Sequence, residues 1–121
     1  IHMRAQKVKN YIQQQKGLVI GLGASTKGNV LLQICDIDKK MLPFISERNP
    51  IKFGLKTMGT DIKLISEEEA RRKNPSCIFV IPWNFKAEIV DREKDYIQSG
   101  GKMLFIMPYP YVLDKNGETK L

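Results

Sequence analysis

Short apolar runs alternate along the chain with stretches in which apolar residues recur every three or four positions. The apolar runs are the expected strands, and they lie at 18–22, 41–45, 62–65, 77–81 and 103–107. Helical spacing is found between them, at 4–15, 26–35, 66–74 and 85–99. Most of the runs are apolar on both faces, which is typical of parallel strands covered by helices. The pattern predicts an α/β fold, a Rossmann-like three-layer domain with a mainly parallel five-stranded sheet in the order 3-2-1-4-5.

The chain of 121 residues is long enough for one domain with a single core. Residues 1–3 are expected to be a cloning remnant. Residues 4–16 form a predicted helix that either links this domain to a preceding one or makes its first layer. The Rossmann-like domain is expected to span 17–113, and the polar residues 114–121 are expected to form a frayed tail.

One stretch, Val19 to Asn29, has the order strand, tight turn, helix. Glycines at the turn let the backbone adopt positive φ and approach a ligand closely. The helix that follows presents free N–H groups and the positive end of its dipole to the same point, and Lys27 adds a positive charge. The turn is therefore a predicted phosphate-binding site. Its candidate residues are Gly21, Gly23, Ala24, Ser25, Thr26, Lys27, Gly28 and Asn29.

The glycine spacing matches neither of two well-known phosphate loops. A dinucleotide fingerprint requires a third glycine three residues after the second, where Thr26 stands. A Walker loop has its lysine after the last glycine, whereas Lys27 precedes Gly28. The alternative interpretation is a tight turn whose glycines serve only packing.

Four further residues are expected beside this turn, at the carboxyl ends of strands, where ligands bind in such sheets. Glu47 lies about twenty residues beyond the glycines, where an acidic residue can bind ribose hydroxyls, and Arg48 follows it. Trp83 would stack on a base or sugar, and Asn84 would contact the ligand. Each has a structural alternative: an ion pair between Glu47 and Arg48, packing of Trp83 between strand and helix, and a helix N-cap at Asn84.

The sequence offers no set of catalytic residues within the chain. His2 belongs to the expected remnant, and without it there is no histidine for a Ser-His or Cys-His pair and no metal-ligand cluster. Glu67, Glu68 and Glu69 follow Ser66 as a helix capping box, which explains the acidic run without a catalytic role. Catalytic groups are therefore expected in another domain, another chain or a cofactor.

Composition narrows the range of partners. The net charge of +7 suits a phosphorylated partner, but the lysines are spread without a dense basic block, so nucleic acid is not expected. No apolar run is long enough for a membrane span and no signal-peptide pattern opens the chain, so we expect no membrane partner and a cytoplasmic location. Cys35 and Cys77 are expected to be small buried apolar residues in a reducing compartment.

Several short blocks of sequence, taken in their order along the chain, form a pattern that is more specific than the glycine turn alone. They are Gly21–Asn29, Arg48–Pro50, Gly59-Thr60, Ser66–Ala70, Pro82–Asn84 and Gly100–Lys102. Together they resemble the C-terminal domain of S-adenosylmethionine-dependent sugar C-methyltransferases, over about 17–108. The resemblance implies a complete enzyme with an N-terminal zinc-binding region and a central S-adenosylmethionine domain that carries the catalytic base. The C-terminal domain then helps to hold a nucleotide-linked sugar and has no cofactor of its own.

The same resemblance distributes roles over the candidate residues. The glycine turn would bind the phosphates, Glu47 and Arg48 would face the ribose or sugar, and Trp83 and Asn84 would lie at the crevice wall. Three departures from the family pattern are visible. Leu22 stands where an aromatic residue is usual, Glu47 replaces an aspartate, and residues 58–63 lack the usual proline and histidine.

Two other functions remain open on the sequence. One is a binding domain for a nicotinamide dinucleotide, with Arg48 meeting a 2′-phosphate. The other is a non-catalytic docking or oligomerisation domain in which the glycine turn binds nothing.

Overall fold

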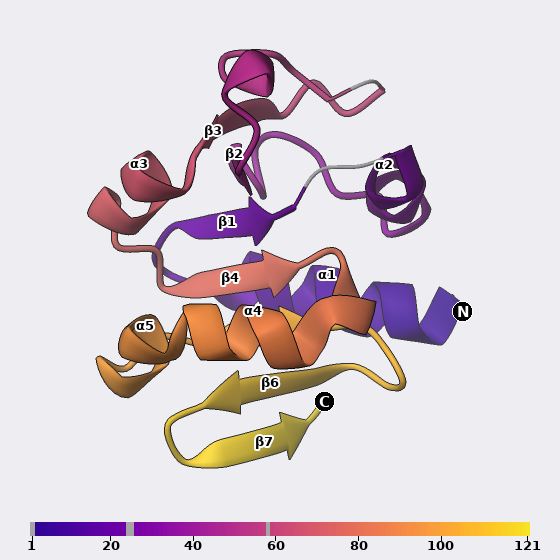
Figure 1. The fold of residues 1–121 in the computed structure, drawn as a ribbon. Helices are drawn as coiled ribbons and strands as arrows, with labels where there is room; N and C mark the ends of the chain where they lie inside the picture. Colours follow the sequence, from indigo (N-terminus) through magenta and orange to yellow (C-terminus); the bar gives the residue numbers. More distant parts are fainter. Residues whose placement is uncertain (1, 24–25, 58) are drawn as a thin grey trace.

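The computed structural model describes residues 2–23, 26–57 and 59–121, with the backbone alone at residues 2 and 26–29. It is an α/β fold built on one sheet with the strand order β3-β2-β1-β4-β5-β6-β7 (Figure 1). The first five strands are parallel to one another. Their bounds are β1 Val19–Leu22, β2 Phe44–Glu47, β3 Lys63–Ser66, β4 Cys77–Val80 and β5 Met103–Phe105.

Two further strands make the sheet mixed and correct the prediction of five strands. The strands β6 (Tyr111–Asp114) and β7 (Gly117–Lys120) form an antiparallel hairpin, and β6 pairs antiparallel with β5. The expectation of a frayed tail beyond residue 113 is therefore wrong. Lys86 holds the hairpin from the neighbouring helix, because its Nζ lies 2.5 Å from Glu118 Oε2 and 4.6 Å from the centre of the Tyr111 ring.

Helices cover both faces of the sheet. On one face lie α1 (His2–Gln14) and α2 (Thr26–Ile34), and on the other lie α3 (Glu67–Arg72), α4 (Lys86–Arg92) and α5 (Lys94–Gln98). In Figure 1, α1 passes behind the sheet and α4 passes in front of it. None of the helices among the described residues is long and apolar enough to cross a membrane.

The alternation of strand residues between the faces separates the core into layers. Val19 packs against the α1 face, whereas Leu22 packs against the α4 face. In α1, the fully buried Val8 and the buried Ile12 belong to the same core cluster as Val19. Helix α1 therefore forms a layer of this domain.

Two element boundaries differ from the predicted ones for local reasons. The second strand begins at Phe44 rather than at residue 41, because Asp38 Oδ1 accepts hydrogen bonds from the N–H groups of Lys40 and Met41 and Pro43 has no N–H to donate. The long helix expected at 85–99 is split into the 3₁₀ turn η2 (Trp83–Phe85), α4 and α5. The break lies at Glu93, whose φ of −106° is outside the helical range.

The capping box predicted at the start of α3 is confirmed in its first half only. Ser66 caps α3, with its side-chain oxygen accepting a hydrogen bond of 3.0 Å from the Glu69 N–H. Glu69 pairs with Lys73 at 3.8 Å, and among the described contacts it makes no return bond to Ser66.

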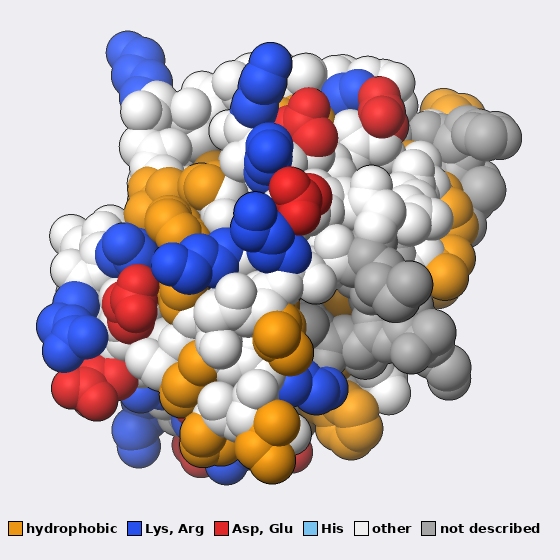
Figure 2. Space-filling view, turned by 90° about the horizontal axis from the view of Figure 1, so that it is seen from above, with side chains coloured by type: hydrophobic (Ala, Val, Ile, Leu, Met, Phe, Trp, Pro, Cys, Tyr) orange, Lys and Arg blue, Asp and Glu red, His pale blue; other side chains and the backbone are white. Residues whose placement is uncertain are grey.

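Figure 2, seen from the β3 edge, shows basic side chains with acidic ones among them.

Candidate functional site

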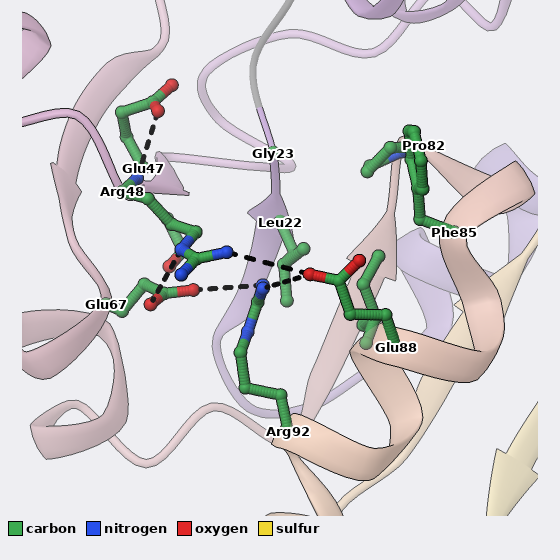
Figure 3. Close-up of a pocket in the computed structure, with 11 residues that line it drawn as sticks. Leu22, Gly23, Glu47, Arg48, Glu67, Pro82, Phe85, Glu88 and Arg92 are labelled. Atoms are coloured by element: carbon green, nitrogen blue, oxygen red, sulfur yellow. Dashed lines mark hydrogen bonds and ion pairs between the residues drawn. The ribbon is translucent and has the colours of Figure 1, made fainter.

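A crevice of about 320 Å³ opens at the carboxyl ends of β1, β2 and β4, between α3 and α4. Leu22 and the buried Ile89 give it an apolar floor. Pro82 and Phe85 form one wall (Figure 3). The crevice lies beside the glycine turn, because Gly23 also lines it. This is the place that the strand order predicts for a ligand, where the chain crosses to opposite sides of β1.

Gly23 holds the turn in place by its backbone. Its φ is +83°, and its N–H donates a hydrogen bond of 2.9 Å to the Ser46 carbonyl at the end of β2. An added Cβ on Gly23 would lie 2.8 Å from Pro82 Cδ, so the two loops are in close contact. Only glycine fits this combination of positive φ and close approach.

The other candidates of the turn fall into two groups. Gly21 lies inside β1, and a Cβ there would meet Leu42 and Ile45 at 3.1 Å, so this position serves the packing of the sheet. Ala24 and Ser25 lie outside the described residues. The backbone of Thr26, Lys27, Gly28 and Asn29 forms the first turn of α2, as predicted; their side chains are not described.

Glu47 is at the end of β2 and is 9% exposed. One carboxylate oxygen, Oε1, accepts hydrogen bonds from the N–H groups of Arg48 and Asn49, at 2.9 and 3.1 Å. The other oxygen, Oε2, is buried without a hydrogen-bond partner among the described residues. Figure 3 shows the carboxylate pointing away from the Arg48 guanidinium. The alternative interpretation of Glu47, an exposed carboxylate in an ion pair with Arg48, is therefore wrong, because the carboxylate is buried and accepts two backbone hydrogen bonds instead.

Arg48 instead enters a ring of four alternating charges, which we call the charge ring. Arg48 lies 3.9 Å from Glu67 and 3.7 Å from Glu88, and Arg92 lies 3.1 Å from Glu67 and 3.6 Å from Glu88. The members come from the end of β2, the start of α3 and the length of α4 (Figure 3). The ring thus spans the crevice above Leu22.

Three members of the charge ring are absent from the predicted site. Glu67 is part of the acidic run that the sequence explains as a capping box, and it serves both the helix start and the crevice. Glu88 and Arg92 are spaced as an i,i+4 pair on a helix, which indicates an exposed ion pair but not a site. No signal in the sequence relates α4 to the end of β2.

Trp83 and Asn84 lie in η2, directly after the crevice wall formed by Pro82. Both are exposed, and neither is among the residues that line the crevice. The N-cap of α4 is Phe85 rather than Asn84. The structure therefore places these two candidates at the rim.

Another ion pair, outside the charge ring, joins the helices on the two sides of the crevice. Arg71 on α3 donates hydrogen bonds to both carboxylate oxygens of the buried Glu93, at 3.0 to 3.3 Å. These bonds raise the pKa of Arg71, so its charge is secure. The pair joins α3 to the break between α4 and α5, and so fixes the separation of the crevice walls.

The described residues of the site offer groups that can bind a ligand. It combines hydrogen-bond acceptors, two guanidinium groups, an apolar floor and a turn followed by a helix start, which together suit a phosphorylated, hydroxyl-bearing ligand. In the part of the chain that the structure describes, no group of three acidic, histidine or cysteine side chains is placed to hold a metal ion.

These features define a domain of the α/β class with a crevice at the carboxyl edge of a largely parallel sheet. A family model described as the C-methyltransferase C-terminal domain matches residues 3–110. The chain belongs to that family.

A curated relative is the C-methyltransferase NovU of Streptomyces niveus, which is 34% identical over 95 residues. The match covers 78% of this chain but 23% of the relative. The chain therefore spans about a quarter of the length of that enzyme.

Proposed function

We propose that this domain holds a nucleotide-linked sugar for an S-adenosylmethionine-dependent C-methyltransferase. The methyl-donor site and the catalytic base would lie in a central domain of the same protein, with which this domain would pack in the cytoplasm. S-adenosylmethionine would supply the methyl group there. This domain would contribute binding and orientation of the sugar substrate.

The observation that carries the proposal is the junction of the glycine turn with the crevice. The Gly23 N–H bond to Ser46 keeps the turn at the end of β2, next to Glu47 and Arg48. A diphosphate at the start of α2 would meet the free N–H groups of a nine-residue helix. A nucleoside or sugar attached to it would then reach the apolar floor formed by Leu22 and Ile89.

The unpartnered oxygen of Glu47 supports the same assignment. A buried acceptor without a partner is costly, and a ligand hydroxyl is a donor that would satisfy it. The position of Glu47 at the end of the strand next to β1 is the one from which an acidic residue binds ribose hydroxyls in nucleotide-binding sheets.

Titration of the chain with uridine diphosphate glucose and thymidine diphosphate glucose tests the proposal. We expect amide chemical-shift changes centred on Gly23, Glu47 and Arg48, and a change in the fluorescence of Trp83 at the rim. Reduced nicotinamide adenine dinucleotide phosphate is the comparison ligand. Binding of that cofactor without any response to the nucleotide sugars would favour the dinucleotide alternative. Indifference to all three, together with a stable dimer that covers the crevice, would favour a docking role.

A further inference from the structure

The contacts of the charge ring differ in distance and in exposure. Arg92 and Glu67 lie 3.1 Å apart, and their side chains are 23% and 19% exposed. The two contacts of Arg48 are longer, at 3.7 and 3.9 Å, and its side chain is 64% exposed. Exposed ion pairs at such distances contribute little, so Arg48 is the member that can leave the ring most readily.

Glu88 is the exposed acidic member of the charge ring and faces Arg48 across the crevice. Its side chain is 62% exposed, and its Oε1 contacts both Arg48 and Arg92. Figure 3 shows Glu88 reaching from α4 and Arg48 reaching from the end of β2 towards each other. The carboxylate therefore lies between two guanidinium groups, where an anionic ligand group would otherwise bind.

Among its described lining residues, the crevice carries more acidic than basic side chains. Glu47, Glu67 and Glu88 line it together with Arg48 and Arg92. An anion that enters meets an excess of carboxylate charge, and both arginines already have carboxylate partners. Arg48 can thus reach a diphosphate at the start of α2 only after it is released from the ring.

We propose that Glu88 is an internal competitor for the ligand diphosphate, and that Arg48 is the anion-binding residue it holds back. The inference rests on the proposed function and adds the residues that set affinity for the charged part of the ligand. When the diphosphate arrives, Arg48 exchanges the Glu88 carboxylate for a phosphate oxygen, while Arg92 keeps Glu67. Arg48 is placed for this exchange, because it follows Ser46 and Glu47 at the strand end to which Gly23 is bonded.

If Glu88 competes with the ligand, removal of its negative charge should raise the affinity for a diphosphate. The variant Glu88→Gln should bind inorganic pyrophosphate and uridine diphosphate glucose about threefold to fivefold more tightly than the parent chain, as expected when an exposed competing ion pair is removed. The variant Arg48→Gln should bind both more weakly. In the double variant the gain from Glu88→Gln should disappear, because its cause is the release of Arg48.

Matched controls lie on the neighbouring helix. Glu68 and Arg72 form an exposed i,i+4 pair at 3.3 Å and do not line the crevice. Glu68→Gln and Arg72→Gln therefore make the same changes of charge outside the crevice, and each should leave affinity within about twofold of the parent, since exposed charges that do not contact the ligand are screened by salt. Calorimetric titration at constant ionic strength measures all six proteins.

The outcomes separate this inference from the proposed function. If the parent chain binds and Glu88→Gln gains nothing, or if Glu68→Gln gains as much, the competitor role is refuted while the proposed function stands. A gain that persists in the Arg48→Gln background would also refute it, because Arg48 would not be the residue released. No binding by the parent or by any variant would instead refute the proposed function.

Discussion

Replacing Gly23 by alanine is expected to destabilise the domain by about 2–5 kcal/mol. The backbone φ of +83° contributes about 1–2 kcal/mol of strain for a residue with a Cβ. That Cβ would also lie 2.8 Å from Pro82 Cδ and 2.9 Å from Pro82 Cγ, so the turn or the proline must move. Overpacking of this kind costs a further amount of about 1–3 kcal/mol.

Gly54 allows the backbone strain to be measured apart from the steric clash. It has the same backbone conformation as Gly23 but no neighbour such as Pro82 close to the added Cβ. Its φ is +85°, and an added Cβ would meet nothing within 4 Å. Gly54→Ala should therefore lower the free energy of unfolding by only about 1–2 kcal/mol. Urea unfolding followed by Trp83 fluorescence measures both variants, and we expect the midpoint of Gly23→Ala to fall by about 1–2 M and that of Gly54→Ala by about half as much.

Pro82→Ala completes the test by removing the ring atoms that the new Cβ would meet. The Gly23→Ala, Pro82→Ala double variant should recover the steric part, which appears as a coupling free energy of about 1–3 kcal/mol between the two positions. Equal losses for the alanine variants of Gly23 and Gly54 would refute the reasoning. So would strict additivity in the double variant, since the close approach to Pro82 would then carry no energy.

Three further predictions concern the elements that build the crevice. Ser66→Ala removes the side-chain cap of α3 and should lower the free energy of unfolding by about 0.5–2 kcal/mol, measured by urea unfolding; an unchanged midpoint would contradict it. Glu93→Gln weakens the hydrogen bonds from the half-exposed Arg71 and should cost about 1–3 kcal/mol, while the isosteric amide keeps the packing; a neutral result would show that the pair does not tie α3 to α5. Stability should fall as the pH rises from about 9 towards 12, because burial raises the pKa of Cys77 from 9.0 to about 12 and also raises the pKa of Tyr96. As the pH rises, the unfolded chain loses these protons before the folded chain does. The free energy of unfolding should therefore differ less between about pH 8 and about pH 11 in Cys77→Ala than in the parent.

The sequence by itself determined the features that depend on neighbouring residues. The change from apolar strand to glycines to helical spacing predicted β1, the turn and the start of α2 at Thr26. Ser66 followed by Glu69 predicted the cap of α3, because a side-chain cap needs only residues three positions apart. Alternation of strands and helices gave the α/β class, and the rule for right-handed crossovers placed β4 beside β1.

Tertiary structure alone decided which side chains share the crevice. The four charges come from three separate elements, with Glu88 and Arg92 sharing α4, and nothing in the sequence distinguishes them from exposed surface groups. The parallel sheet brings them together, because it aligns the carboxyl end of β2 with the starts of α3 and α4. The hairpin of β6 and β7 was not predicted for the same reason. Polar residues such as those of β7 form a strand only where another strand satisfies their backbone, and β6 does so here.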